Sequence, residues 1–171
     1  KELLNKLDYK CIVGDLDRQV TQVVYDSRKI TEGCLFICIK GANFNGHDYA
    51  LEACERKAAC VVVCEDVNVP ADTATTIIRV DDTRYAMAFI AAEWFGNPAD
   101  KLKVIGITGT KGKTTTTYLV KSILEQTGRK VGLIGTIETI IGDEKIPANN
   151  TTPESYILQE TFAKMVNAGL D

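Results

Sequence analysis

Two hydrophobic patterns alternate along the first half of the chain: short continuous apolar runs, and apolar residues at helical spacing. The runs at residues 34–39 and 60–64 predict strands buried on both faces, and shorter runs at 22–26 and 76–80 predict two more strands. A helix is expected at residues 48–57, between the two continuous runs. This order of elements is typical of a small α/β domain.

Another helix is predicted after residue 82, with Asp81 or Asp82 as its N-terminal cap. Its expected apolar face consists of Tyr85, Ala88, Phe89, Ala92 and Phe95. Residues 96–100, Gly-Asn-Pro-Ala-Asp, end this helix and have the composition of a linker. We therefore predict a first domain at residues 1–97 and the first part of a second domain at residues 98–171.

The second half opens with an apolar run at residues 104–107, which predicts a strand. A helical pattern follows at 115–126 and ends at Gly128, and the next strand is expected at 131–135. This order fits a parallel sheet with a right-handed crossover, as in P-loop-type ATPase domains. A domain with so few strands could not close its sheet, so we expect the sequence to be the front part of a longer protein.

Two local signals follow. Gly142-Asp143 predicts a tight turn between apolar segments at 137–141 and 145–146. Thr152-Pro153-Glu154 predicts a helix start, with Thr152 as N-cap, proline at the first helical position and a carboxylate in the first turn.

The clearest chemical signal lies between the 104–107 run and the helix, in Gly109-Thr110-Lys111-Gly112-Lys113-Thr114-Thr115. Small residues let successive backbone N–H groups turn inward, and a helix N-terminus adds partial positive charge, so this loop predicts a polyphosphate cradle. Lys113 would reach the β- and γ-phosphates, and the Thr114 hydroxyl would ligate Mg²⁺. The strict P-loop pattern is not met, because it requires glycine where this chain has Ile107.

Composition narrows the class of partner. A net charge of −3 gives no general reason to expect nucleic acid or an anionic membrane, and no apolar run approaches the roughly 20 residues that span a bilayer. We expect a cytoplasmic monomer. The six cysteines form no C-x-x-C pair, and four lie in or beside predicted strands. We expect these four to be small buried hydrophobes rather than metal ligands or disulfide partners.

Three separated motifs resemble those of the ATP-dependent Mur ligases, which build the peptide stem of peptidoglycan. The loop at 108–115 resembles the family's T-G-T-x-G-K-T-T signature, which also explains the departure at Ile107. Residues 26–36 resemble a D-S-R…G-x-L-F pattern, and residues 41–49 a G-x-x-x-[DN]-G-H-x-[FY] loop, in the first domain of these ligases. Residues 150–154, Asn-Thr-Thr-Pro-Glu, resemble the N-T-T-P-E segment of the branch that adds the third residue of the stem.

The resemblance implies an ATP- and Mg²⁺-dependent ligase. It would join a diamino acid, L-lysine or meso-diaminopimelate, to UDP-N-acetylmuramoyl-L-Ala-D-Glu through an acyl phosphate, with Lys113 as the catalytic group. The loop 109–115 would bind ATP. The residues implied for the UDP-muramoyl substrate are Ser27, Asn43, Gly46, His47, Asn150, Thr151 and Thr152. Further required parts, a second metal carboxylate, a carbamylated lysine and a third domain, would lie beyond Asp171, so these 171 residues alone are expected to be inactive.

Simpler structural roles remain open for several of these residues. Ser27 could be a turn former, Arg28 could only pair with Asp26, and His47 is more often a capping or packing residue than a catalytic one. Two other functions also remain open: the Mur ligase that adds D-Ala-D-Ala, which shares the first two motifs, and a non-catalytic module that senses nucleotide. The segment 150–154 argues against the former, and the Ser27 region with Thr151-Thr152 argues against the latter.

Overall fold

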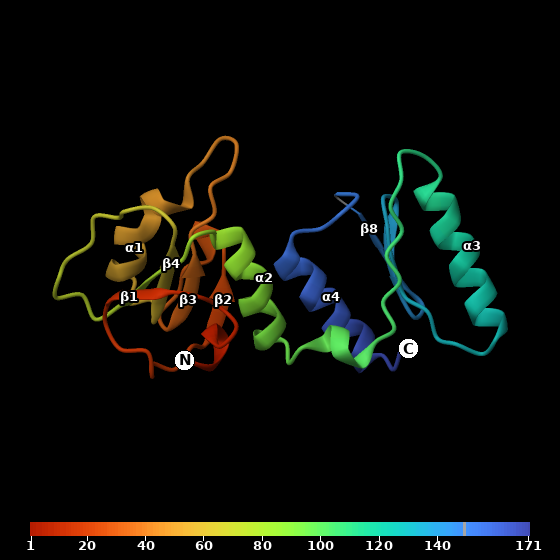
Figure 1. The fold of residues 1–171 in the computed structure, drawn as a ribbon, viewed down its shortest axis with the longest axis horizontal. Coiled ribbons are helices and arrows are strands. Elements are labelled where there is room, and N and C mark those ends of the chain that lie inside the picture. The colour runs from red at the N-terminus through yellow and green to blue at the C-terminus, as the bar shows by residue number, and fades with distance from the viewer. Residues whose placement is uncertain (149) are drawn as a thin grey trace. The chain divides into compact units, whose positions relative to one another are not determined.

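The computed structural model describes residues 1–148 and 150–171, which form two compact units, Lys1–Trp94 and Phe95–Asp171. The boundary lies close to the linker expected at residues 96–100. Each unit builds its own sheet and its own helices (Figure 1). No helix in the described part of the chain has the length and apolar character needed to cross a membrane.

The first unit is a five-stranded sheet in the order β1-β5-β4-β3-β2. Its strands are β1 (Lys10–Val13), β2 (Gln22–Val24), β3 (Cys34–Ile37), β4 (Cys60–Val63) and β5 (Thr76–Arg79). The strands β2 to β5 are parallel, and β1 joins the edge of β5 in the antiparallel sense. The sequence predicts β2 to β5, slightly too long at their ends, whereas β1 was not predicted.

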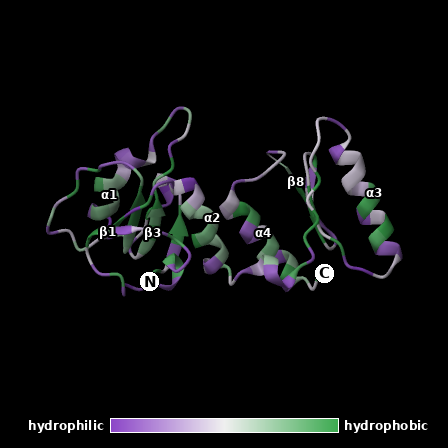
Figure 2. Ribbon diagram, in the orientation of Figure 1, coloured by the Kyte–Doolittle hydropathy of each residue, from purple (hydrophilic) through white to green (hydrophobic). Residues whose placement is uncertain are grey.

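The helices α1 (Ala50–Glu55) and α2 (Thr83–Trp94) cover this sheet, and short 3₁₀ turns lie at Glu2–Leu4, Ser27–Lys29 and Gly46–Tyr49. Every residue of β3 and β4 is buried, as their continuous apolar runs predict, and both strands are strongly hydrophobic in Figure 2. A core cluster joins Phe36 and Val61 to Ala50 and Ala53 of α1. The predicted α/β class of this unit is thereby confirmed.

The helix α2 buries a different face from the one predicted. Asp82 caps it as expected, because its carboxylate accepts hydrogen bonds from the Arg84 and Tyr85 N–H groups at 2.7 and 3.1 Å. The side of α2 that packs inward consists of Thr83, Ala86, Met87, Ile90 and Ala91. Tyr85, predicted to be on the apolar face, is 62% exposed and contacts the Phe89 ring in a tilted arrangement, with 4.8 Å between ring centroids.

The second unit contains the 3₁₀ turn η4 (Pro98–Lys101), the helices α3 (Lys113–Gln126) and α4 (Ser155–Asn167), and a three-stranded sheet. The strands β6 (Leu133–Ile134), β7 (Glu138–Ile141) and β8 (Glu144–Pro147) pair antiparallel in that order. The register pairs Ile141 with Glu144, so Gly142-Asp143 is the two-residue turn that the sequence predicts. The Tyr118 hydroxyl of α3 donates to a Glu138 carboxylate oxygen at 2.7 Å and ties α3 to β7.

The strand predicted at residues 104–107 does not form. Val104 and Ile105 are 55% and 60% exposed, and residues 103–109 have no strand assignment in the described structure. A strand needs a ladder partner, and the nearby β6 pairs with β7 instead. The expected parallel crossover around α3 is therefore absent from the described part of this unit.

The start of α4 also differs from the prediction. The helix begins at Ser155 rather than at Pro153, and Glu154 occupies the N-cap position without a capping hydrogen bond from its own side chain. Glu154 itself has an extended backbone (φ −57°, ψ 151°) and lies just before the helix. Its carbonyl accepts the first helical hydrogen bond, from the Leu158 N–H. Thr152 is exposed and lies outside the helix, and so it is not the cap.

Candidate functional site

The glycine-rich loop leads directly into the N-terminus of α3. Gly112 is the N-cap residue and has a positive φ of 78°, a conformation that glycine adopts without steric cost. Gly112 has no side chain that could cap this helix end. The first N–H groups of α3 therefore keep their hydrogen-bonding capacity, and together with the helix dipole they suit a phosphate oxygen.

Lys113 folds back over the loop. Its ammonium Nζ donates to the Gly109 carbonyl at 2.6 Å, which places a positive charge against the loop backbone. The Thr116 hydroxyl and N–H both bond to the Gly112 carbonyl at 2.9 Å, and the Thr117 hydroxyl donates to the Thr114 carbonyl at 2.7 Å. These hydroxyl groups fasten the first turn of α3, whereas Thr110, Lys111 and Thr115 are exposed.

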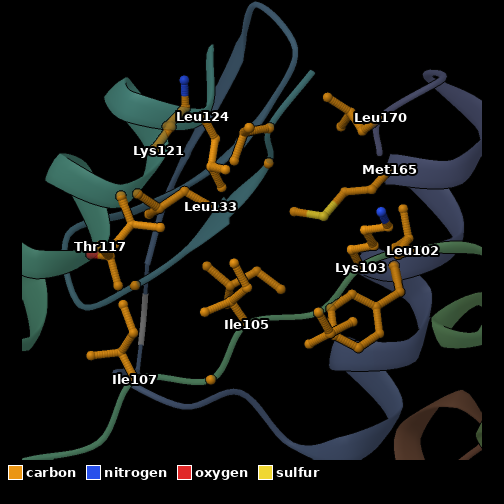
Figure 3. Close-up of a pocket in the computed structure, with 18 of the residues that line it drawn as sticks. Leu102, Lys103, Ile105, Ile107, Thr117, Lys121, Leu124, Leu133, Met165 and Leu170 are labelled. Atoms are coloured by element: carbon orange, nitrogen blue, oxygen red, sulfur yellow. The ribbon is translucent and has the colours of Figure 1, made fainter. Parts of the chain in front are cut away.

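A cavity of about 740 Å³ lies between this loop, α3, β6 and α4 (Figure 3). Its floor is apolar, with Ile105, Leu133 and Met165 directed toward it in the close-up. Its polar wall includes Gly109, Lys113 and Thr114 from the phosphate loop. An apolar hollow with a few convergent polar groups is the usual form of a small-molecule site.

The same cavity reaches the 150–154 segment. Thr151, Thr152 and Pro153 line it, so the structure brings together two motifs that are separated by about forty residues in the sequence. Asn150 is exposed and is not among the lining residues. Thr110, Lys111, Gly112 and Thr115 likewise lie outside the lining.

A second group of candidate residues lies in the first unit, where the parallel strands β2, β3 and β4 end. Carboxyl ends of neighbouring parallel strands share one edge of a sheet, and ligands commonly bind there. Ser27 starts the 3₁₀ turn after β2 and is partly exposed. Asn43 and Gly46 belong to the segment after β3, and Asn43 is exposed. The sequence predicts all three as substrate-binding residues, and their roles stay predictions.

Asp26 organises the turn that carries Ser27. Its carboxylate accepts from the Arg28 backbone N–H at 3.1 Å and from the Arg28 guanidinium at 2.9 and 2.7 Å. The hydrogen bond from this guanidinium is the main cause that lowers the pKa of Asp26 from 3.8 to about 2. Arg28 thus pairs with Asp26, as the simpler interpretation of the sequence held, while its side chain remains 87% exposed.

His47 is buried, with 7% of its surface exposed, and both of its ring nitrogens contact protein groups. Nδ1 lies 2.7 Å from the Asn45 side-chain oxygen, and Nε2 accepts from the Cys64 N–H at 3.0 Å. Burial is the main cause that lowers the pKa of His47. The imidazole is therefore built into the fold, and the substrate contact predicted for His47 stays a prediction.

Three polar residues of this edge were not predicted from the sequence. Lys40 donates to one oxygen of Glu65 at 2.8 Å, and the Asn45 amide donates to the other at 3.2 Å. The Lys40 ammonium is the main cause that lowers the pKa of the Glu65 carboxyl group. The available signal was position: Lys40 and Glu65 each follow the end of a buried strand.

Metal ligands are sparse in the described residues. They contain no group of three or more His, Cys, Asp or Glu side chains that could hold a metal ion. The Thr114 hydroxyl at the start of α3 is the group that the phosphate loop offers to a nucleotide-bound cation, and one such hydroxyl fits a metal whose other ligands are phosphate oxygens and water.

Both units match models of one protein family. Residues 19–95 match the catalytic domain of the Mur ligase family, and residues 107–171 match the Mur ligase middle domain. Among curated proteins, the UDP-N-acetylmuramoyl-L-alanyl-D-glutamate--2,6-diaminopimelate ligase of Clostridium perfringens is 50% identical over 171 residues, which are the whole of this chain and 35% of that protein. The chain therefore spans about a third of the length of this relative.

Solved structures agree on the fold. A UDP-N-acetylmuramoyl-L-alanyl-D-glutamate--2,6-diaminopimelate ligase superposes on 91% of this chain and 32% of its own, with a TM-score of 0.68 at 22% identity. The MurF ligase of Thermotoga maritima in complex with ADP covers 88% of this chain and 30% of its own, with a TM-score of 0.52 at 25% identity. On the matched domains, the 50% identity and the shared fold, the chain belongs to the Mur ligase family.

Proposed function

We propose that this chain is the substrate- and nucleotide-binding portion of an ATP-dependent ligase that joins meso-diaminopimelate to UDP-N-acetylmuramoyl-L-Ala-D-Glu. The observation that carries the proposal is the common cavity of the phosphate loop and the Thr151-Thr152 pair, because nucleotide and acceptor must meet for a phosphoryl transfer. The name of the Clostridium perfringens relative, 50% identical over the whole chain, supports diaminopimelate as the added amino acid.

The proposed reaction has two steps. The terminal carboxylate of the muramoyl dipeptide attacks the γ-phosphorus of ATP and ADP leaves. The amine of the diamino acid then attacks the acyl phosphate, loses a proton and displaces inorganic phosphate. The first step brings two anions together, so neutralisation of charge is the main demand on the protein.

The residues of the phosphate loop can meet this demand. Lys113 would transfer its hydrogen bond from the Gly109 carbonyl to a phosphate oxygen and stabilise the charge that develops there. The N–H groups at the start of α3 would take further phosphate oxygens, since the N-cap residue Gly112 has no side chain to occupy them. A Mg²⁺ ion held in part by Thr114 would supply additional positive charge to the phosphates. Thr151 and Thr152 would orient the acceptor from the other wall of the cavity.

In the first unit, Ser27 and the segment after β3 would hold the UDP end of the substrate. The MurF ligase of Thermotoga maritima was solved with ADP, which supports an adenine nucleotide as a ligand of this chain. The phosphate loop before α3 would hold that nucleotide in the second unit. In this proposal, the first unit binds the UDP end of the substrate and the second unit binds ATP.

The test is phosphate release by the full-length polypeptide that contains this chain, with ATP, Mg²⁺ and UDP-N-acetylmuramoyl-L-Ala-D-Glu. L-Lysine and meso-diaminopimelate are added in separate reactions. Release that depends on meso-diaminopimelate is the expected result, and release with lysine alone would change the amino acid but keep the reaction.

A different pair of substrates distinguishes the neighbouring ligase. Release only with a UDP-muramoyl tripeptide and D-Ala-D-Ala would transfer the protein to the branch that adds that dipeptide. ATP binding without release under any of these conditions would favour the nucleotide-sensing module.

A further inference from the structure

The hydrogen bonds of His47 fix its tautomer. A backbone N–H can only donate, so the Nε2 atom that faces the Cys64 N–H at 3.0 Å must be the acceptor. The ring proton therefore lies on Nδ1, which donates to the Asn45 side-chain oxygen at 2.7 Å. The same oxygen also accepts the His47 backbone N–H at 3.1 Å. His47 thus connects the residue after β4 to the segment after β3.

Asn45 extends this connection to the base of a loop, residues 40–45. Its amide nitrogen donates to Glu65, whose other oxygen receives the Lys40 ammonium at 2.8 Å. Lys40 and Asn45 also form an antiparallel β-bridge, and the Gly41 N–H donates to the Phe44 carbonyl at 2.8 Å. The loop is closed at its base by these contacts, and it is held to the end of β4 through His47 and Glu65.

Gly46 allows the close approach that this arrangement needs. A Cβ atom at Gly46 would lie 2.6 Å from the Ile39 backbone nitrogen, a distance that no side chain tolerates without a backbone shift. Beyond the closed base, Asn43 and Phe44 form an exposed tip, and Phe44 is 75% exposed.

We infer that His47 is a positioning residue that holds the 40–45 loop, as its neutral Nδ1–H tautomer, in the form that receives the UDP end of the substrate. This inference rests on the proposed function, because it assigns the loop to that substrate. Its physical basis is pre-organisation: a loop that is already ordered loses little conformational entropy when a ligand binds.

Protonation of His47 would oppose this arrangement. A second ring proton would place an N–H on Nε2 directly against the Cys64 N–H, so that two donors face each other. The charged or titratable groups that surround the ring are Glu65, Asp48, Lys40 and the Cys64 thiol at 3.6 Å. Glu65 and Asp48 favour the protonated ring and Lys40 opposes it, but burial outweighs them and keeps the ring neutral.

The first experiment detects the tautomer without any substrate. His47 is the only histidine of this chain, so a long-range ¹H–¹⁵N correlation spectrum of the chain reports it without overlap. At neutral pH we expect Nδ1 at the shift of a protonated nitrogen and Nε2 at that of an unprotonated one. A ring that averages between tautomers, or that carries its proton on Nε2, would overturn the inference.

The second experiment separates the two ring hydrogen bonds of His47, to Asn45 and to Cys64, with two variants of the full-length enzyme. His47→Asn keeps an amide donor near the Nδ1 position, and His47→Gln keeps an acceptor near the Nε2 position. Each variant therefore loses one of these two hydrogen bonds. We expect KM for the UDP-muramoyl substrate to rise about tenfold in both, from the cost of ordering a few side chains, with kcat and the KM for ATP within about twofold of wild type.

A pH profile separates positioning from a purely structural role. The wild-type KM for the UDP-muramoyl substrate should rise as the pH falls through the range where His47 gains a proton, and this rise should be absent from His47→Gln. The matched control is Asp72→Asn, an exposed carboxylate in a surface loop, for which KM and its pH profile should equal those of wild type. Unchanged KM in both histidine variants would refute the positioning role.

Failures of the two proposals can be told apart. An inactive wild-type enzyme would count against the proposed function, whereas the tautomer and the order of residues 41–45, measured by ¹⁵N relaxation, still decide whether His47 holds the loop. If the histidine variants do not fold, Asn45→Ala removes the acceptor of Nδ1 and leaves the ring in place. It should raise the mobility of residues 41–45, and an unchanged loop would overturn the inference.

Discussion

The ammonium of Lys113 lies 2.6 Å from the carbonyl oxygen of Gly109, four residues earlier in the chain. This contact closes the phosphate loop on itself. It holds the Lys113 ammonium beside the loop, with the Gly109 carbonyl as the partner that a phosphate oxygen would replace. A ligand anion would exchange one hydrogen bond of Lys113 for a stronger, charge-assisted one. In the proposed function, nucleotide binding would therefore change the hydrogen-bond partner of Lys113 rather than its location.

Lys113→Ala is expected to lower the rate of substrate-dependent phosphate release. Loss of one pre-organised electrostatic contact typically reduces kcat by about 10²–10³. Steady-state kinetics of the full-length enzyme measure the effect, and Lys164→Ala, which removes an ammonium that pairs with Glu160 on α4, is the control. A Lys113→Ala rate within tenfold of wild type would show that this lysine does not stabilise the transferred phosphoryl group.

Gly112→Ala should strain the start of α3. The residue has φ 78°, and no neighbouring atom lies within 4 Å of the position that an alanine methyl group would take, so the cost is conformational rather than steric crowding. A left-handed alanine costs about 1–2 kcal/mol. Denaturant unfolding measures this loss, and Gly106→Ala is the matched control, because its site is equally open and its φ is not positive. Equal stability of the two variants would contradict the explanation.

Asp26 should titrate unusually low. Its folded pKa of about 2 lies below the ordinary 3.8, so the Arg28 contact stabilises the fold above pH 3.8, and this contribution is lost as the pH falls through about 2. A ¹³C carboxyl titration of the chain detects the midpoint. Arg28→Gln should return the midpoint of Asp26 toward its ordinary value. If the midpoint is the same in both proteins, the guanidinium does not cause the shift.

The same substitution at two phenylalanines should affect stability very differently. Phe36→Ala removes a ring with 0% exposure from the middle of β3 and should cost about 3–5 kcal/mol of unfolding free energy. Phe44→Ala removes a ring that is 75% exposed and should change stability by less than about 0.5 kcal/mol. Urea denaturation of both variants tests the contrast, and a large loss in Phe44→Ala would mean that the loop tip packs against the fold.

The sequence predicts the elements of the first unit well where apolar residues form continuous runs. Within the runs at 34–39 and 60–64, residues 34–37 and 60–63 form strands that are buried on both faces, as expected. By contrast, α2 has apolar residues around much of its circumference, so periodicity alone did not select its buried side. Contact with the sheet selects Met87 and Ile90 rather than Tyr85. The half-exposed edge strand β1 was missed because its four residues show only a weak alternation.

In the second unit, local sequence signals predicted the turn and the helix after the phosphate loop, but not which strands pair in the sheet. Gly142-Asp143 and the helix after the phosphate loop form as expected, since both depend on neighbouring residues. The strand at 104–107 depends on a distant partner, which no local pattern reveals. The cavity gathers Gly109, Lys113, Thr114, Thr151 and Thr152 but not Asn150. Their binding roles remain predictions, and Lys113→Ala tests the one assigned to Lys113.

All six cysteines of the chain lie between residues 11 and 64, in the first unit. Burial raises the pKa of Cys34, Cys38 and Cys60, which sit in the parallel core strands or directly beside β3, so these thiols are poor nucleophiles while the sheet is closed. Their alkylation by a soluble thiol reagent must wait for the sheet to open. Mass spectrometry of this reaction would therefore time the opening of the first unit separately, without a signal from the second.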